Sequence, residues 1–201
     1  MVLLSQRQRM LDAIVDAVAE KGYAAATVAD VTRRAGVSRT TFYEHFSDKQ
    51  DCYLAAYRDG GDVHYAYVRQ SIDRTKDPVQ RLHDALDAYL GVLASQPAFA
   101  RAFLAEVRAA GPRALALHDQ LHERYVNLLR LVHAELRERE STLPDLPDEV
   151  LRAVTGAIDS LIVRRLQENP SADVTALAPA ARYLLLTTLG LTAKAREALR
   201  V

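Results

Sequence analysis

Three helix-start signals fall within 21 residues near the N-terminus, and they constrain the fold of this chain more than any other feature. The signals are Thr27, Ser38 and Ser47, whose side-chain oxygens can accept hydrogen bonds from the unpaired N–H groups of a first helical turn. An acidic or amide residue stands three positions after the first and the last of them, as in a capping box. Gly36 can adopt the left-handed conformation that a sharp turn requires. The stretch therefore predicts two short helices joined by a tight turn, with a third helix beginning directly afterwards.

Helical patterns continue to the C-terminus. Apolar residues recur at three- and four-residue spacing, whereas alternating β-branched runs and Asn-Gly turns do not occur. Ala, Leu and Arg are the commonest residues, and these residues favour helices. We expect an all-α fold of about nine helices. The first four are predicted at residues 5–21, 27–36, 38–46 and 48–75, the fifth begins at Asp77-Pro78, the sixth at Pro97, and the seventh spans 113–140. The eighth follows the 141–149 loop and ends near Gln167, and the ninth runs from Asp173 to the C-terminus after a break at Asn169-Pro170.

The capping signals also set a small N-terminal segment apart. We predict a helix-turn-helix domain at residues 1–50 and a second helical domain at residues 51–201. The whole chain has 26 Lys and Arg against 26 Asp and Glu, and the first 50 residues hold seven basic against six acidic side chains. A nucleic-acid-binding surface must therefore arise from where the charges lie, since no basic excess exists.

A helix-turn-helix places its second helix in the major groove and lays the first across the DNA backbone. Short polar side chains and one or two long donors suit base edges and phosphates. Arg39 is the candidate for a bidentate contact to guanine, and Thr40 for a thymine methyl group or a base edge. The alternative, that the hydroxyls only cap the helix and Arg39 is a solvated charge, does not account for six polar residues on one short helix. The predicted DNA-binding residues are Thr27, Arg33, Ser38, Arg39, Thr40, Thr41, Tyr43, His45 and Lys49.

The same segment resembles the DNA-binding signature of the tetracycline-repressor (TetR) family of bacterial transcriptional regulators. The resemblance covers about residues 10–55, and Thr32 departs from it where the family usually has Ala. The matching residues, all at the family's spacing, are Thr27-Val28, Ala35-Gly36-Val37-Ser38, Thr41, Tyr43, His45-Phe46 and Lys49.

Several expectations follow from this resemblance. It implies a homodimer built on the last two long helices, a ligand cavity in the C-terminal domain, and a palindromic double-stranded DNA operator with half-sites about 34–36 Å apart. Tyr43, Lys49 and Thr27 would contact phosphates, while Arg39 and Thr40 would face bases. Family members usually repress transcription, and an inducer shifts the helix that follows the DNA-binding head. An activator, or a regulator that does not respond to a ligand, is the alternative.

A small-molecule pocket is expected among the middle helices. Its lining would be mostly Leu and Phe with a few polar groups, which suits an apolar or amphipathic ligand. The alternative is that each of these residues simply packs in a core. The candidates are Tyr65, Leu86, Tyr89, Leu90, Phe103, Val107, His118, Leu121, Tyr125 and Asp159.

The last two long helices carry the dimerisation pattern. The segment ARYLLLTTLGLTA is apolar nearly all round, so it must be buried on more than one side. A symmetric helix–helix interface would cover it, and burial within one chain is the alternative. The candidate interface residues are Val154, Ile158, Leu161, Leu184, Thr188 and Leu191.

Three weaker features have simpler explanations. His118 and His122 lie four residues apart as in some metal sites, but spacing supplies no clear third ligand, so no metal is predicted. Cys52 stands at an inward-facing position, where a buried, unreactive thiol is expected. Gly60-Gly61 interrupts a long helical pattern, and we hypothesise a hinge there.

An enzyme is the least favoured class. No nucleophile–base pair, glycine-rich phosphate loop or metal-ligand cluster supports one, and no cofactor is expected. A single cysteine fits a reducing compartment, and no stretch has the roughly 18–20 apolar residues of a membrane span. We therefore expect a cytoplasmic protein that associates with the bacterial nucleoid through DNA and has no membrane partner.

Overall fold

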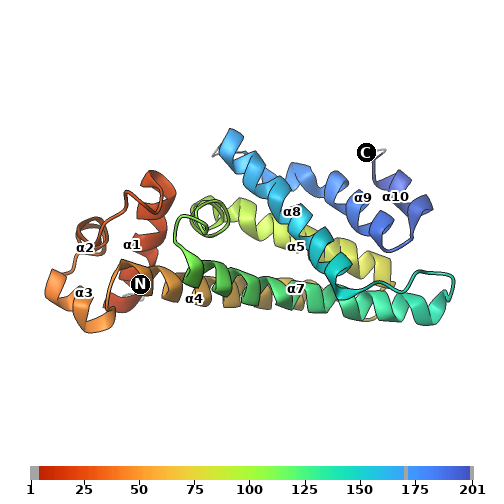
Figure 1. Ribbon diagram of the computed structural model, residues 1–201, viewed down its shortest axis with the longest axis horizontal. Coiled ribbons are helices and arrows are strands. Elements are labelled where there is room, and N and C mark those ends of the chain that lie inside the picture. The colour runs from red at the N-terminus through yellow and green to blue at the C-terminus, as the bar shows by residue number, and fades with distance from the viewer. Residues whose placement is uncertain (1–4, 170–171, 200–201) are drawn as a thin grey trace. The chain divides into compact units, whose positions relative to one another are not determined.

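The computed structural model describes residues 5–169 and 172–199, and every regular element within these ranges is helical (Figure 1). The all-α prediction is confirmed, with ten α-helices in the described residues where about nine were expected. No helix in these ranges is long and apolar enough to cross a bilayer. The elements are α1 (Gln6–Lys21), α2 (Val28–Ala35), α3 (Arg39–His45), α4 (Lys49–Ser71), α5 (Pro78–Ser95), α6 (Pro97–Ala100), the π-helix η1 (Arg101–Ala105), α7 (Pro112–Arg139), α8 (Asp148–Glu168), the 3₁₀-helix η2 (Val174–Leu177), α9 (Ala178–Thr188) and α10 (Thr192–Ala198).

The chain packs as two compact units. The N-terminal unit contains the chain up to Asp62 together with Gln96–Asp119, and the C-terminal unit contains Val63–Ser95 together with the chain from Gln120 onward. Packing thus divides the chain elsewhere than at the predicted boundary between residues 50 and 51, because the start of α4 belongs to the core of the N-terminal unit. A functional division at residue 50 remains a prediction.

The N-terminal unit is built on the predicted caps, with one correction: Asp48 and not Ser47 caps α4, because Asp48 Oδ1 accepts a hydrogen bond from the Asp51 N–H at 2.7 Å. Ser5 accepts a hydrogen bond from the Gln8 N–H at 3.1 Å and starts α1. Thr27 and Asp30 form the capping box of α2, and Gly36 ends that helix in the left-handed conformation with φ of 63°. Helix α1 packs against α2 on one side and against α6 and η1 on another. The short segment 97–105 is therefore part of the support of the helix-turn-helix.

The expected interruption at Gly60-Gly61 is absent, because residues 49–71 form one helix. A Cβ atom at Gly60 would lie 2.2 Å from the nearest ring carbon of Phe99. Gly60 thus provides room for an aromatic ring against the helix backbone. The hinge hypothesis remains untested.

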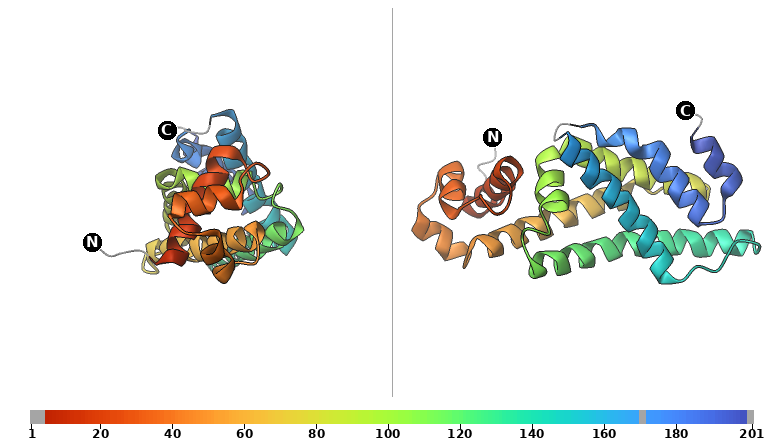
Figure 2. Two further views of the ribbon diagram at one scale, coloured as in Figure 1. Left: turned by 90° about the vertical axis from the view of Figure 1, so that its left-hand side faces the viewer. Right: turned by 45° about the horizontal axis from the view of Figure 1, so that its top comes forward.

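The C-terminal unit differs from prediction at its end. Residues expected to form one last helix form η2, α9 and α10, and α10 turns back beside α9 (Figure 2). Gly190 makes this turn possible with φ of 85°, and a Cβ atom there would lie 2.7 Å from Pro144 Cδ. The expected break at Pro170 and the chain end at residues 200–201 lie outside the described residues.

Candidate functional site

Helix α3 presents a polar face on an apolar anchor. Phe42 is fully buried and fastens the helix to the unit, whereas the Ser38 hydroxyl caps it by accepting from the Thr41 N–H at 2.9 Å. Thr41 is half-buried beside this cap, and its hydroxyl lies 2.9 Å from that of Ser38. The predicted residues Arg39, Thr40, Tyr43 and His45 are all exposed. The anchor leaves these side chains free to meet an external partner.

Sequence reasoning omitted Glu44, which is exposed one turn after Thr40 on the same helix. A carboxylate can accept a hydrogen bond from the amino group of cytosine in the major groove. Helical periodicity alone places Glu44 on the same face as Thr40, and this signal in the sequence could have identified Glu44 as a candidate for DNA contact.

The start of α2 is held by a buried carboxylate. Asp30 accepts from the Thr27 N–H at 3.0 Å and from the Thr27 hydroxyl at 2.8 Å, and it pairs with Lys21 at 2.6 Å and Arg33 at 2.7 Å. Hydrogen bonds from Lys21 and Thr27 hold the pKa of Asp30 well below its usual value. The Thr27 side chain is thus already engaged in the cap, whereas Arg33 remains largely exposed. Phosphate contacts by either residue stay predictions.

Lys49 has a structural role that the sequence did not reveal. Its Nζ donates to the carbonyl oxygens of Tyr23 at 2.7 Å and Ala26 at 2.8 Å, and it lies 4.2 Å from the centre of the Tyr23 ring. Burial lowers the pKa of Lys49. An ammonium group has three N–H donors, so two are used in holding the loop between α1 and α2. The predicted phosphate contact would have only the third.

Residues 96–119 reach the helix-turn-helix through several contacts within the N-terminal unit. Glu106 accepts a hydrogen bond from the Tyr23 N–H at 2.8 Å. The Gln50 side chain donates to the Ala110 carbonyl at 2.7 Å, and the Tyr53 hydroxyl donates to that of Ala102 at 2.6 Å. The start of α4 and the end of α1 are therefore tied to the same segment.

This packing corrects three predicted pocket residues, Phe103, Val107 and His118, which all lie in the N-terminal unit. Phe103 is fully buried and stacks on Tyr57 with ring centres 4.5 Å apart. His118 Nδ1 lies 2.8 Å from the Tyr57 hydroxyl oxygen. Phe103 and Val107 are buried in that unit and His118 is half-buried there, and periodicity cannot reveal which unit an apolar face joins.

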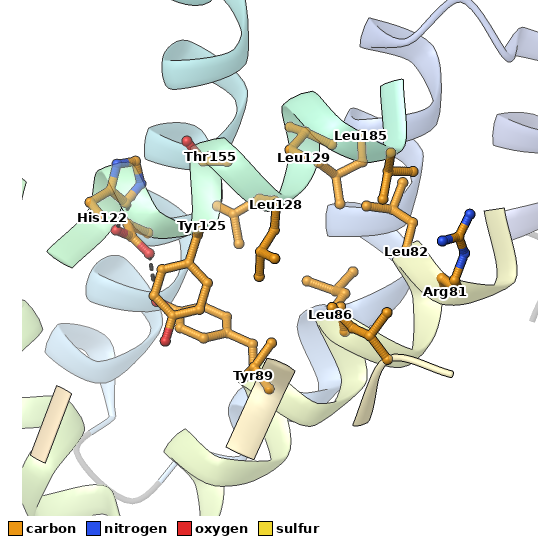
Figure 3. Close-up of a pocket in the computed structure, with 16 residues that line it drawn as sticks. Arg81, Leu82, Leu86, Tyr89, His122, Tyr125, Leu128, Leu129, Thr155 and Leu185 are labelled. Atoms are coloured by element: carbon orange, nitrogen blue, oxygen red, sulfur yellow. Dashed lines mark hydrogen bonds and ion pairs between the residues drawn. The ribbon is translucent and has the colours of Figure 1, made fainter. Parts of the chain in front are cut away.

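A cavity of about 90 Å³ lies within the C-terminal unit (Figure 3). Four predicted residues line it: Leu86, Tyr89, Tyr125 and Asp159. Leu90 and Leu121 are buried outside the lining, and Tyr65 touches the ring of Tyr125 without lining the cavity. The lining residues that sequence reasoning missed are Val68, Ile72, Arg81, Leu82, Ala85, His122, Leu128, Leu129, Val132, Thr155, Ile158 and Leu185.

The cavity is amphipathic. In Figure 3, Tyr89, His122 and Tyr125 gather at one end of the labelled side chains and Arg81 lies at the other, with leucines between them. The Tyr89 hydroxyl donates to Asp159 Oδ1 at 2.8 Å, and His122 Nε2 lies 3.4 Å from Asp159 Oδ2. Helix α7 contributes His122 and Tyr125 and then, on its following turns, Leu128, Leu129 and Val132. The cavity wall therefore changes from polar to apolar along this one helix.

Comparison with known proteins identifies the family. The model of bacterial regulatory proteins of the tetR family matches residues 10–56, and a tetracyclin repressor-like C-terminal domain matches residues 75–163. The chain belongs to the tetR family. The prediction of a DNA-binding transcriptional regulator, as opposed to an enzyme, is thereby confirmed at the level of the family.

Relatives of this tetR-family chain include named transcriptional regulators, one of them a fatty acid metabolism regulator. It is 37% identical over 84 residues to the HTH-type transcriptional activator FasR of Mycolicibacterium smegmatis. This match covers 42% of this chain but only 38% of FasR. It is 21% identical over 180 residues to the fatty acid metabolism regulator protein of Bacillus subtilis, covering 89% of this chain and 93% of that protein. The solved structure of FadR from Bacillus subtilis in complex with stearoyl-CoA is 19% identical, covers 90% of this chain and 98% of that chain, and has a TM-score of 0.79. This last likeness establishes the tetR-family fold.

The predicted dimer residues of this tetR-family chain separate into two groups. Val154, Ile158 and Leu191 are buried within the single chain, and Ile158 lines the cavity. They are therefore removed from the predicted interface. Leu161 and Leu184 are half-buried, as is Thr188. These three side chains retain surface that a second chain can cover.

The weaker sequence features have structural roles. His118 and His122 face different partners, Tyr57 and Asp159, and within residues 5–169 and 172–199 no three His, Cys, Asp or Glu side chains gather as a metal ion would need. Cys52 is fully buried, and desolvation raises the pKa of its thiol to about 12. Such a thiol is scarcely ionised near neutrality and is poorly suited to redox sensing.

Proposed function

We propose that this protein is a transcriptional repressor that binds a palindromic operator as a homodimer and is released by an effector with a long apolar chain. The exposed polar face of α3 carries the proposal. Arg39, Thr40 and Tyr43 are exposed on a short helix whose buried side is anchored by Phe42. Side chains of these types form hydrogen bonds with base edges in the major groove and with the phosphates beside it.

The cavity supports the effector part of the proposal. Its lining is mostly aliphatic, with two tyrosines and a histidine at one end and Arg81 at the other, which suits an amphipathic molecule. One relative named above is called a fatty acid metabolism regulator, and one similar structure was solved with stearoyl-CoA. An acyl chain attached to a thioester is therefore the effector class that we infer.

The size of the cavity bears on how the effector acts. Its volume of about 90 Å³ is smaller than the roughly 300–1,000 Å³ of typical ligand pockets. An acyl chain therefore requires that the surrounding helices move apart. A ligand favours the conformation that binds it better, so the effector would stabilise a conformation with an expanded cavity over the conformation present without ligand. This coupling is how effector binding would lower DNA affinity.

The operator and the effector are tested together. Purified protein is used to select duplexes from a random pool, and the enriched sequence is assayed by gel shift at a stated salt concentration. We expect a palindrome whose half-sites lie about one helical turn apart, and release of the DNA when stearoyl-CoA is added. Enrichment of no sequence at moderate salt contradicts DNA binding. Enrichment without release contradicts the effector.

An activator is the second candidate, because the relative FasR is named as one. Deleting the gene distinguishes the two functions. Transcription from a promoter that carries the selected operator rises if the protein represses and falls if it activates. The cytoplasmic, nucleoid-associated location expected from the sequence belongs to both versions of the proposal.

A further inference from the structure

Tyr125 differs from the other polar residues that line the cavity. Among the described residues, none forms a hydrogen bond with its hydroxyl group, although burial is extensive enough to raise its pKa. Its ring is held from two sides, by Tyr65 with ring centres 5.4 Å apart and by Tyr89 at 5.1 Å. The structure thus holds a hydroxyl donor in place, and none of the described residues serves as its acceptor.

The neighbours of Tyr125 have their own contacts. Asp159 receives the Tyr89 hydroxyl on one carboxylate oxygen and faces His122 with the other. The remaining wall is almost entirely aliphatic, with Leu86, Leu128 and Ile158 among its members. A molecule in the cavity would therefore meet hydrogen-bonding groups at this end and mostly hydrocarbon from there to Arg81.

We propose that the Tyr125 hydroxyl donates a hydrogen bond to a neutral oxygen of the effector, namely the carbonyl oxygen of an acyl thioester. This inference rests on the proposed effector class and assigns its recognition to one donor. A neutral acceptor fits because the Asp159 carboxylate lies at the same end of the cavity. The hydrocarbon chain then extends along the leucines toward Arg81 (Figure 3).

The energetic consequence is selectivity for the carbonyl group. Burying a carbonyl without a donor is unfavourable, whereas a thioether has no such group to desolvate. With Tyr125 present, the carbonyl and the hydroxyl satisfy one another, and a net hydrogen bond of this kind corresponds to about a tenfold change in affinity. Removing the hydroxyl should therefore weaken binding of the thioester and leave binding of the thioether unchanged.

The test compares two probes that differ by one oxygen: S-decanoyl-N-acetylcysteamine, a thioester, and S-decyl-N-acetylcysteamine, the matching thioether. Their dissociation constants are measured by calorimetry for the wild type, for Tyr125→Phe and for Tyr65→Phe. The last variant is the matched control, because Tyr65 contacts Tyr125 but does not line the cavity. We expect the wild type and Tyr65→Phe to prefer the thioester by about tenfold, and Tyr125→Phe to lose this preference or to favour the thioether.

A spectroscopic measurement makes the inference independent of how the variants fold. The infrared carbonyl band of a ¹³C-labelled thioester should shift to lower frequency in the wild-type complex than in an aprotic solvent. An unshifted band, a wild-type preference within twofold, or an unchanged preference in Tyr125→Phe overturns the inference. Failure of the wild type to bind either probe also overturns it. None of these results affects operator binding, which the gel shift tests separately.

Discussion

At the scale of single residues, local signals were predictable and distant contacts were not. The caps at Ser5, Thr27 and Ser38 were readable because each joins residues three positions apart. The structural role of Lys49 was not predictable, because its carbonyl partners belong to residues 26 and 23 positions earlier in the chain. The family resemblance singled out this residue but did not reveal what its ammonium group contacts, and the phosphate contact stays a prediction.

Replacing Lys49 by Met should therefore reduce the stability of the protein as well as any DNA affinity. The expected loss is about 1–3 kcal/mol, because two carbonyl oxygens lose a charged donor. Urea unfolding followed by circular dichroism measures it. Arg39→Ala is the matched control, since that exposed side chain should change stability by no more than about 0.5 kcal/mol. Equal stability of Lys49→Met and the wild type would contradict the structural role.

Asp30 provides a prediction about pH. Its pKa in the folded protein is lowered from a usual value of 3.8 by hydrogen bonds from Lys21 and Thr27. The charged form is thus favoured by folding, so its stabilising effect is fully present above the unfolded-state pKa and is lost as the pH falls below it.

The melting temperature of Asp30→Asn should lie below that of the wild type at pH 7, and the gap should close as the pH falls below about 4. Differential scanning calorimetry over this range measures the gap. Asp16→Asn serves as a control, because Asp16 is exposed on α1 and its replacement should produce little gap at either pH. A gap for Asp30→Asn that does not depend on pH would contradict the account.

At the scale of helices, the presence of each N-terminal helix and its starting position were predictable from the sequence. The structural roles of the glycines were not. Helices α1 to α4 begin within one or two residues of their predicted starts because capping chemistry is local. The division of the last helix at Gly190 depends on Pro144, which lies far away in sequence. Gly60 likewise depends on Phe99, so a glycine pair that suggested a hinge occupies a continuous helix.

Gly60→Ala should destabilise the protein by about 1–3 kcal/mol, because the added methyl group displaces the Phe99 ring. The cost should shrink when Phe99→Leu is also present, since a smaller side chain leaves room for it. Urea unfolding of the two single variants and the double variant measures this coupling. Gly91→Ala, in a helix with open space around the added atom, should instead be neutral or stabilising by up to about 1 kcal/mol. Equal effects of the two glycine substitutions would contradict the packing role.

At the scale of the whole molecule, the allocation of residues to the two units escaped prediction. Tyr89 and Tyr125 line the cavity of the C-terminal unit, whereas Phe103 lies in the N-terminal unit and stacks on Tyr57; their role as ligand contacts stays a prediction. The reason is that an apolar helical face indicates burial without identifying the neighbour that buries it.

The same limitation applies to the dimer, which remains a proposal. Helices α8 and α9 pack together, and each has half-buried side chains one turn apart. Ala157 and Leu161 form one such pair, and Leu184 and Thr188 form the other. Two short stripes on adjacent helices are the kind of surface that a second copy can cover symmetrically.

Light scattering after gel filtration should therefore give the mass of a dimer for the wild type and of a monomer for Leu184→Asp. Leu131→Asp is the control, because Leu131 on α7 is 68% exposed and lies outside the proposed face. A monomeric wild type contradicts the dimer. A dimer that survives Leu184→Asp and dissociates with Leu131→Asp relocates the interface to α7.

The central claim is that α3 reads DNA sequence, and a ratio of two dissociation constants tests it most directly. Fluorescence anisotropy at one stated salt concentration compares the selected operator with a scrambled duplex for the wild type, Arg39→Ala and Arg196→Ala. Arg196 is an exposed residue of α10, so its variant loses the same charge elsewhere. Arg39→Ala should lower the operator preference by about 10- to 100-fold, and Arg196→Ala should leave it unchanged. An operator preference that Arg39→Ala does not alter would contradict the assignment of α3 as the reading helix.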